Sequence, residues 1–176
     1  MMKKNMKGQA AMEYLMTYGW AILAIVIVIA ALIWLNPFGA PEMCLFQQQG
    51  LSCSEPPPQM YLDGDGDLFM NVRIENKLGK KVDIQEMVCT DAQVSDMEEG
   101  YGIQYSDISI PTGTYYNFYD TEAVPCVDAN GDELDGFAPN QEFRGRLIVW
   151  YNFADDIDPD IKHQAQANVV SIVVEQ

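Results

Sequence analysis

Two short acidic stretches have a spacing that suits calcium. Asp63, Asp65 and Asp67 alternate with glycines, and the stretch 128–132 (Asp-Ala-Asn-Gly-Asp) repeats the pattern. Side-chain oxygens at alternate positions can converge on one Ca²⁺ ion. Neither stretch continues as an EF-hand loop, because the expected glycine and glutamate are missing further along. Asp-Gly and Asn-Gly also form ordinary turns, so solvated turns are the favoured interpretation and calcium the alternative.

A second group that could bind a ligand is aromatic. Its members lie between residues 101 and 119: Tyr101, Tyr105, Tyr115, Tyr116, Phe118 and Tyr119. Exposed tyrosines could hold sugars or a neighbouring subunit, because each offers a large rigid surface with a polar tip. Ordinary packing between strands is the favoured interpretation.

Catalytic residue patterns are scarce. The single histidine, His163, lies in the polar stretch 155–166. The sequence has no G-x-S-x-G, no glycine-rich phosphate loop and no H-E-x-x-H. We therefore expect that the protein is not an enzyme and needs no cofactor apart from the calcium alternative.

Four cysteines, an even number, lie in the polar part of the chain: Cys44, Cys53, Cys89 and Cys126. The absence of C-x-x-C spacing argues against a zinc site and against thioredoxin-like chemistry. An exported domain can keep disulfides, and four cysteines allow three pairings. We favour Cys44–Cys53, which closes a small loop around Gly50, together with Cys89–Cys126. Buried free thiols are the alternative.

These groups follow a long apolar stretch. From Ala21 to Leu35 there is no charged or strongly polar residue. Counted from Tyr14, the stretch has about 22 residues, and at about 1.5 Å each a helix of that length crosses a hydrocarbon core of roughly 30 Å. Because it is apolar on every face, such a helix must be surrounded by lipid or by other helices. Asn36-Pro37 should end it.

Charge is distributed unevenly about this helix. The chain has a formal net charge of −16 from 10 basic and 26 acidic residues, yet Lys3, Lys4 and Lys7 all precede the helix. The positive-inside rule places such a leader in the cytoplasm and the following domain outside. The excess of acid repels phosphate backbones, so nucleic acid is not an expected partner.

Beyond the helix, the pattern predicts strands. Residues 37–59 are rich in proline and are expected to form an extended connector. Alternating apolar residues or short apolar runs then predict strands at 68–75, 82–89, 102–110, 114–119, 144–153 and 168–175. The predicted fold class is α+β, with a long N-terminal hydrophobic helix followed by an antiparallel β-sandwich, of which an immunoglobulin-like domain is one form.

The residues around Gly8 are more specific than the apolar stretch. Lys7-Gly8-Gln9 is followed, five residues after the glycine, by the lone acid Glu13 and then by Tyr14. This arrangement resembles the class III signal peptide of archaeal type IV pilins, which a prepilin peptidase cuts between Gly8 and Gln9. A secretory signal or a plain anchor is the alternative, but the apolar stretch is longer than the roughly 7–15 residues of a secretory signal.

The resemblance implies a division of the chain and a role for each part. Residues 1–8 would be a cleaved leader, 9–36 the helix of the membrane and the filament core, 37–59 the connector and 60–176 the external domain. Glu13 and Tyr14 would act in assembly, with Glu13 pairing with a neighbour's N-terminal amine.

The expected function is therefore that of a structural subunit of an archaeal surface filament serving adhesion. Its partners would be identical subunits, the prepilin peptidase and, before assembly, membrane lipid. It would lie in the cell membrane as a precursor and in the extracellular filament when mature. The alternative is a membrane-anchored extracellular binding protein that does not polymerise.

Overall fold

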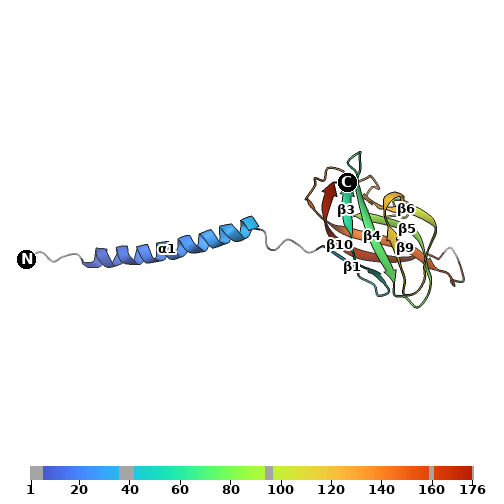
Figure 1. The fold of residues 1–176 in the computed structure, drawn as a ribbon, viewed down its shortest axis with the longest axis horizontal. Coiled ribbons are helices and arrows are strands. Elements are labelled where there is room, and N and C mark those ends of the chain that lie inside the picture. The colour runs from blue at the N-terminus through green and yellow to red at the C-terminus, as the bar shows by residue number, and fades with distance from the viewer. Residues whose placement is uncertain (1–5, 36–41, 94–96, 159–160, 176) are drawn as a thin grey trace, which may run out of the picture. The chain divides into compact units, whose positions relative to one another are not determined.

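The structure is a computed structural model that describes residues 6–35, 42–93, 97–158 and 161–175. The chain divides into two compact units, Met1–Ala40 and Pro41–Gln176 (Figure 1). The start of the expected leader, the predicted helix end at Asn36-Pro37 and the first part of the expected connector lie outside the described residues.

Helix α1 (Met6–Leu35) makes up the described part of the first unit. The predicted apolar helix is therefore confirmed, and it begins before Gly8 rather than after it. Its large apolar side chains between Met12 and Trp34, where the structure describes them, are exposed, from 44% at Leu32 to 86% at Trp34. The stretch Met12–Trp34 is long and apolar enough to cross a membrane, a property that a signal sequence near an N-terminus shares.

The second unit is built from strands. They are β1 (Met43–Phe46), β2 (Leu51–Cys53), β3 (Gln59–Leu62), β4 (Leu68–Asn76), β5 (Val82–Thr90), β6 (Ile103–Ile110), β7 (Tyr115–Phe118), β8 (Val124–Val127), β9 (Glu142–Phe153) and β10 (His163–Glu175), with a short 3₁₀ helix, η2 (Asp120–Glu122), between β7 and β8. All six predicted strands are present, although β10 begins five residues earlier than predicted, at His163.

Six of these strands form a closed barrel in the order β10-β3-β4-β8-β5-β9. Strand β9 closes the ring because it pairs with β5 along one edge and with β10 along the other. The other described strands flank this ring: β1 pairs with β10, β6 with β5, and both β2 and β7 with β4.

The closed barrel corrects the expectation of an antiparallel sandwich. Pairings β10–β3 and β5–β8 are parallel, whereas the other pairings among the described strands are antiparallel. Strands β5 and β10 are long enough to pair with two partners in succession along one edge. The C-terminal end of each therefore joins strands that would belong to the opposite sheet of a sandwich.

The boundary between connector and domain also needs correction. Residues 37–59 were expected to be an extended connector, but β1 and β2 lie within this range and pair with β10 and β4. Their backbone groups are thus satisfied by the sheet. The described part of the expected connector, from Glu42 onward, belongs to the second unit.

The barrel interior is filled by the alternating side chains that the pattern predicted. In β4, Met70, Val72 and Ile74 are at most 5% exposed, whereas Asn71 and Arg73 lie on the other face and are only partly buried. Strand β9 buries Leu147 to Trp150 at consecutive positions, as its uninterrupted apolar sequence indicated. Leu147 and Val149 belong to the main core, whereas Ile148 and Trp150 face the other way and pack into a second, smaller apolar cluster with Val88, Met97 and Val127.

Candidate functional site

The expected processing and assembly residues all belong to α1. Gly8 and Gln9 lie in its first turns, and the side chains of Glu13 and Tyr14 are exposed. Glu13 is the only charged residue between Lys7 and Glu42. The rings of Tyr14 and Tyr18, one helical turn apart, have centroids separated by 4.5 Å. The helix thus presents one acid and a pair of aromatic rings near the beginning of its apolar stretch.

The remainder of α1 is a continuous apolar surface. The stretch Met12–Trp34 contains 23 residues, which as a helix span about 35 Å. A methyl group added at Gly19 would meet nothing within 4 Å, so the described chain imposes no need for a small residue there. Small residues in an apolar helix allow other helices to approach closely. The helix is suited to lipid or to a bundle of like helices.

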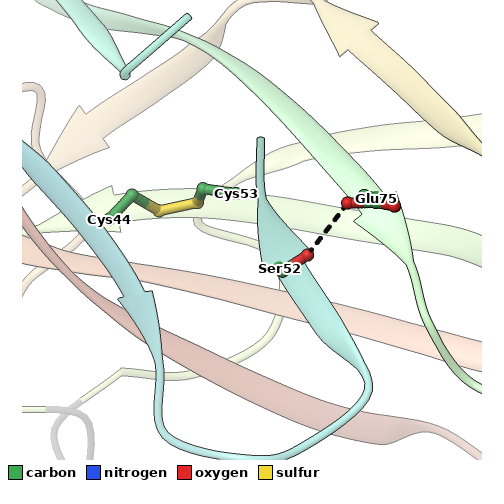
Figure 2. The surroundings of a disulfide bond; sticks show 4 residues. All are labelled: Cys44, Ser52, Cys53 and Glu75. Carbon is green, nitrogen blue, oxygen red and sulfur yellow. Dashed lines mark hydrogen bonds between the residues drawn. A yellow bond between two sulfur atoms is a disulfide. The ribbon is translucent and has the colours of Figure 1, made fainter. Parts of the chain in front are cut away.

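Two disulfides join strands of the second unit, and their pairing is the one expected from the sequence. Cys44 on β1 is bonded to Cys53 on β2, with Cα atoms 5.7 Å apart (Figure 2). Beside this bond, the Ser52 hydroxyl donates a hydrogen bond to the Glu75 carboxylate on β4, at 3.4 Å. The bond links the two described strands of the expected connector.

The second disulfide, Cys89–Cys126, lies at one of the two parallel pairings that close the barrel. Both cysteines are fully buried, and their Cα atoms are 4.2 Å apart. They face each other directly in the register of β5 and β8. None of the four cysteines is a free thiol. The bond fixes the place where β5 leaves its neighbour β6 to join β8.

The acidic stretches form turns stabilised by their own backbone. One carboxylate oxygen of Asp63 accepts hydrogen bonds from the backbone N–H groups of Asp65 and Asp67, at 2.9 and 3.0 Å. Asp128 does the same for Asn130 and Asp132, which lowers the pKa of the Asp128 carboxyl. Among the described residues, no group of three or more histidine, cysteine or acidic side chains is arranged to hold a metal ion. Calcium binding by Asp63, Asp65 and Asp67 stays an untested prediction.

These two turns are neighbours in space. The Leu68 N–H donates to the Leu134 carbonyl at 3.0 Å, which brings residues 63–67 beside the stretch that follows Asp132. The pKa of Glu133 is raised, chiefly by a hydrogen bond with Asp67 and to a smaller extent by repulsion from the nearby aspartates. Like charges therefore accumulate at this end of the barrel.

The aromatic group divides between core and surface. Tyr105 and Phe118 are buried, and their rings pack edge to face with centroids 5.3 Å apart. The Tyr105 hydroxyl donates to the Glu122 carbonyl at 2.9 Å, and burial raises its pKa. Tyr115 and Tyr119 are 56% and 54% exposed. Strand packing, the favoured interpretation, is correct for the first pair and leaves the second pair available to a ligand.

His163 lies in a structural environment at the start of β10. Its ring packs against Tyr151 and Phe153, with centroids 5.5 and 4.9 Å away. Its Nε2 atom lies 3.2 Å from a carboxylate oxygen of Asp156, which also accepts the Phe153 N–H. This pair holds the turn after β9 against the barrel.

One buried acid could not be foreseen from the sequence. Glu86 on β5 is fully buried, and its carboxylate accepts hydrogen bonds from the N–H groups of Gly100 and Gly102, at 2.8 and 2.9 Å. The side-chain amide of Gln104 donates a hydrogen bond to the other carboxylate oxygen of Glu86, at 2.5 Å. A register shift between Ile84 and Glu86 lets this side chain reach the loop before β6. The burial of Glu86 depends on that bulge, and an alternating sequence pattern does not reveal a bulge.

Neither a scan against protein-family models nor a search of curated proteins finds a match for this chain. The function is therefore argued from α1, the residues at its start and the disulfide-bonded barrel.

Proposed function

We propose that this protein is a pilin-like structural subunit of an archaeal type IV pilus-like surface filament. The observation that carries the proposal is α1, an apolar helix whose large side chains are exposed and whose lone acid, Glu13, follows the Lys7-Gly8-Gln9 junction closely. An immunoglobulin-like sandwich, the finer prediction for the external part, is not needed for this role; a separate folded unit after the helix is sufficient.

The helix serves the subunit in two successive environments. Before assembly, lipid surrounds Met12–Trp34 and anchors the precursor with its lysines in the cytoplasm. A prepilin peptidase then cuts between Gly8 and Gln9, and the helix leaves the lipid for a bundle of identical helices. The apolar surface stays covered throughout, because both environments exclude water from it.

Glu13 sets the axial offset between subunits. Cleavage creates an amine at Gln9, four residues or about 6 Å of helix rise before Glu13. In an apolar bundle an unpaired carboxylate costs several kcal/mol, so the offset that pairs it with a neighbour's amine is strongly favoured. Tyr14, adjacent to Glu13 and packed against Tyr18, would contribute packing at the same level.

The barrel fits the outer part of such a filament. Two disulfides are typical of a protein exported to an oxidising environment. Its acidic surface keeps it soluble outside the membrane, where adhesion would take place. The competing proposal, a membrane-anchored binding protein that does not polymerise, is favoured by the surface cavity described below and needs no cleavage after Gly8.

The test is to isolate the protein from its native cells and to examine it in two ways. Mass spectrometry should find Gln9, or its pyroglutamate, at the N-terminus, and electron microscopy should find filaments that contain this subunit. An intact leader without filaments would refute the filament role and favour the anchored binding protein. A start near Glu42 would show that the helix is a cleaved secretory signal.

A further inference from the structure

A cavity of about 300 Å³ lies on the outer side of β4. Its polar lining comes from three segments that are distant in the sequence: Gln59, Asn71, Arg73, Asn117 and Asp120, with Tyr119 as the exposed aromatic ring. The volume is at the lower end of the range for small-molecule sites, about 300–1,000 Å³. It is large enough for one small polar ring.

The cavity exists because the strands on both sides of β4 are interrupted at the same level. Along one edge, β2 ends at its pairing with Ile74 and β3 begins at Asn71. Along the other edge, β7 ends at Val72, and β8 resumes at Met70 only after the intervening η2. The outward side chains Asn71 and Arg73 therefore lie on the floor between two irregular segments, 54–58 and 119–123.

One polar group in this floor is unsatisfied. The Asn71 Oδ1 atom is buried and has no hydrogen-bond partner, and only one other side-chain atom among the described residues, the Ser54 Oγ, shares this condition. A buried acceptor without a donor destabilises the folded state. Asn71 is one of the residues that line the cavity, so a ligand bound there could supply the missing donor.

The other polar groups are held in place. The Arg73 Nε donates to the Asn117 side chain at 2.6 Å, and its guanidinium carbon lies 4.5 Å from the centre of the Tyr115 ring. Asp120 has a φ of 54°, a left-handed conformation that non-glycine residues adopt rarely and that is enriched at ligand sites. The cavity therefore presents a cation held by these contacts, a carboxylate and three side-chain amides around one exposed ring.

We propose that this cavity binds a single neutral saccharide unit of a surface glycan. A sugar hydroxyl both donates and accepts, so it can supply the donor that Asn71 lacks and also engage Asp120 and Asn117. Tyr119 offers a flat face for the apolar side of a pyranose ring. A small anion is disfavoured because Asp120 balances Arg73 and the chain carries a net charge of −16.

The inference goes beyond assembly and does not depend on it, since every residue involved belongs to the second unit and none to α1. The test uses the full-length chain in a zwitterionic detergent, because maltoside detergents carry sugar headgroups that would compete. Saturation-transfer NMR and calorimetry are run with methyl glucoside, methyl galactoside, methyl mannoside and N-acetylglucosamine, and with inorganic phosphate as the anionic probe. We expect saturable binding of at least one sugar, with a Kd on the order of 1 mM for so shallow a site.

Two matched pairs of variants locate the binding. Tyr119→Ala should weaken it by about tenfold, whereas Tyr119→Phe, which keeps the ring, should bind within about twofold of the parent. Asn71→Ala should weaken it similarly and yet unfold at no lower temperature, because it removes an unsatisfied acceptor. Asn168→Ala, on β10 away from the cavity, should change neither property.

Three results would overturn the proposal. These are the absence of saturable binding to every sugar, tighter binding of phosphate that Arg73→Gln abolishes, and sugar binding that persists unchanged in both Tyr119→Ala and Asn71→Ala. Loss of filaments, or their presence, has no bearing on any of them, so the failure of the filament proposal and the failure of this one can be told apart.

Discussion

The two disulfides should contribute unequally to stability, and their loop lengths give the difference. In the chain-entropy model, a cross-link stabilises by restricting the unfolded chain, more so when it closes a longer loop. Cys44 and Cys53 are 9 residues apart, and Cys89 and Cys126 are 37 apart. The model gives about 2.5 kcal/mol for the first bond and about 4 kcal/mol for the second. The longer bond also fixes the β5–β8 pairing that helps close the barrel.

The assay is equilibrium urea unfolding of the unit Pro41–Gln176 under oxidising conditions, followed by far-UV circular dichroism. The variants are the pairs Cys44→Ala with Cys53→Ala and Cys89→Ala with Cys126→Ala, so that no unpaired thiol remains. Removal of the second pair should lower the free energy of unfolding by about 1–2 kcal/mol more than removal of the first. The reasons are its longer loop and the cavity that loss of the buried sulfur atoms of Cys89 and Cys126 leaves. An equal loss, or a larger loss for the first pair, would refute the reasoning.

Four further outcomes are expected. Glu13→Ala should leave membrane insertion and cleavage intact and sharply reduce filaments seen by electron microscopy, because register is no longer specified. Gly19→Leu should do the same, since the monomer has room for the side chain and a bundle does not. Glu86→Ala should lower the free energy of unfolding by about 1–3 kcal/mol, since buried N–H groups lose their acceptor, as urea unfolding would show. The raised pKa of Glu133 means that its ionisation disfavours the folded state, so stability is lost as the pH rises above its ordinary value of 4.5. Glu133→Gln should therefore raise the thermal midpoint at pH 7 slightly, with the gain vanishing well below pH 4.5.

The helix and the longer strands could be predicted because their signal is local. An apolar stretch that shows no preferred face, or an alternation such as that of β4, can be recognised from neighbouring residues alone. Strands β1, β2, β3 and β8 were missed because each has at most four residues and lies beside prolines or turns. Their pairing is decided by the edges of β10 and β4, which the local sequence does not describe.

Closure of the barrel and the cavity escaped prediction for a related reason. Alternation reports which face of a strand is buried, but it does not report which strand lies at its edge. The parallel pairings at the ends of β5 and β10 and the bulge at Glu86 are edge properties. The cavity likewise depends on two irregular segments on either side of β4. From the alternation alone, Asn71 can be identified only as an outward-facing residue of a strand.

The lone acid of α1 bears most directly on the choice between a filament and a tether. A helix whose only task is to anchor a domain in lipid is more stable with leucine than with a carboxylate at its margin, because the acid must be hydrated or paired. Glu13 becomes favourable only where a cation meets it, and the described α1 offers no basic side chain in its last turn or elsewhere beyond Lys7. Cleavage after Gly8 would remove that lysine and create an amine at Gln9 in its place. On its own helix this amine lies one turn away, but a neighbouring helix, shifted along the bundle axis, can bring its amine directly to the acid. In a filament, cleavage at the Gly8-Gln9 junction would supply the amine that pairs with Glu13. In a simple membrane anchor, Glu13 has no such partner and is unfavourable.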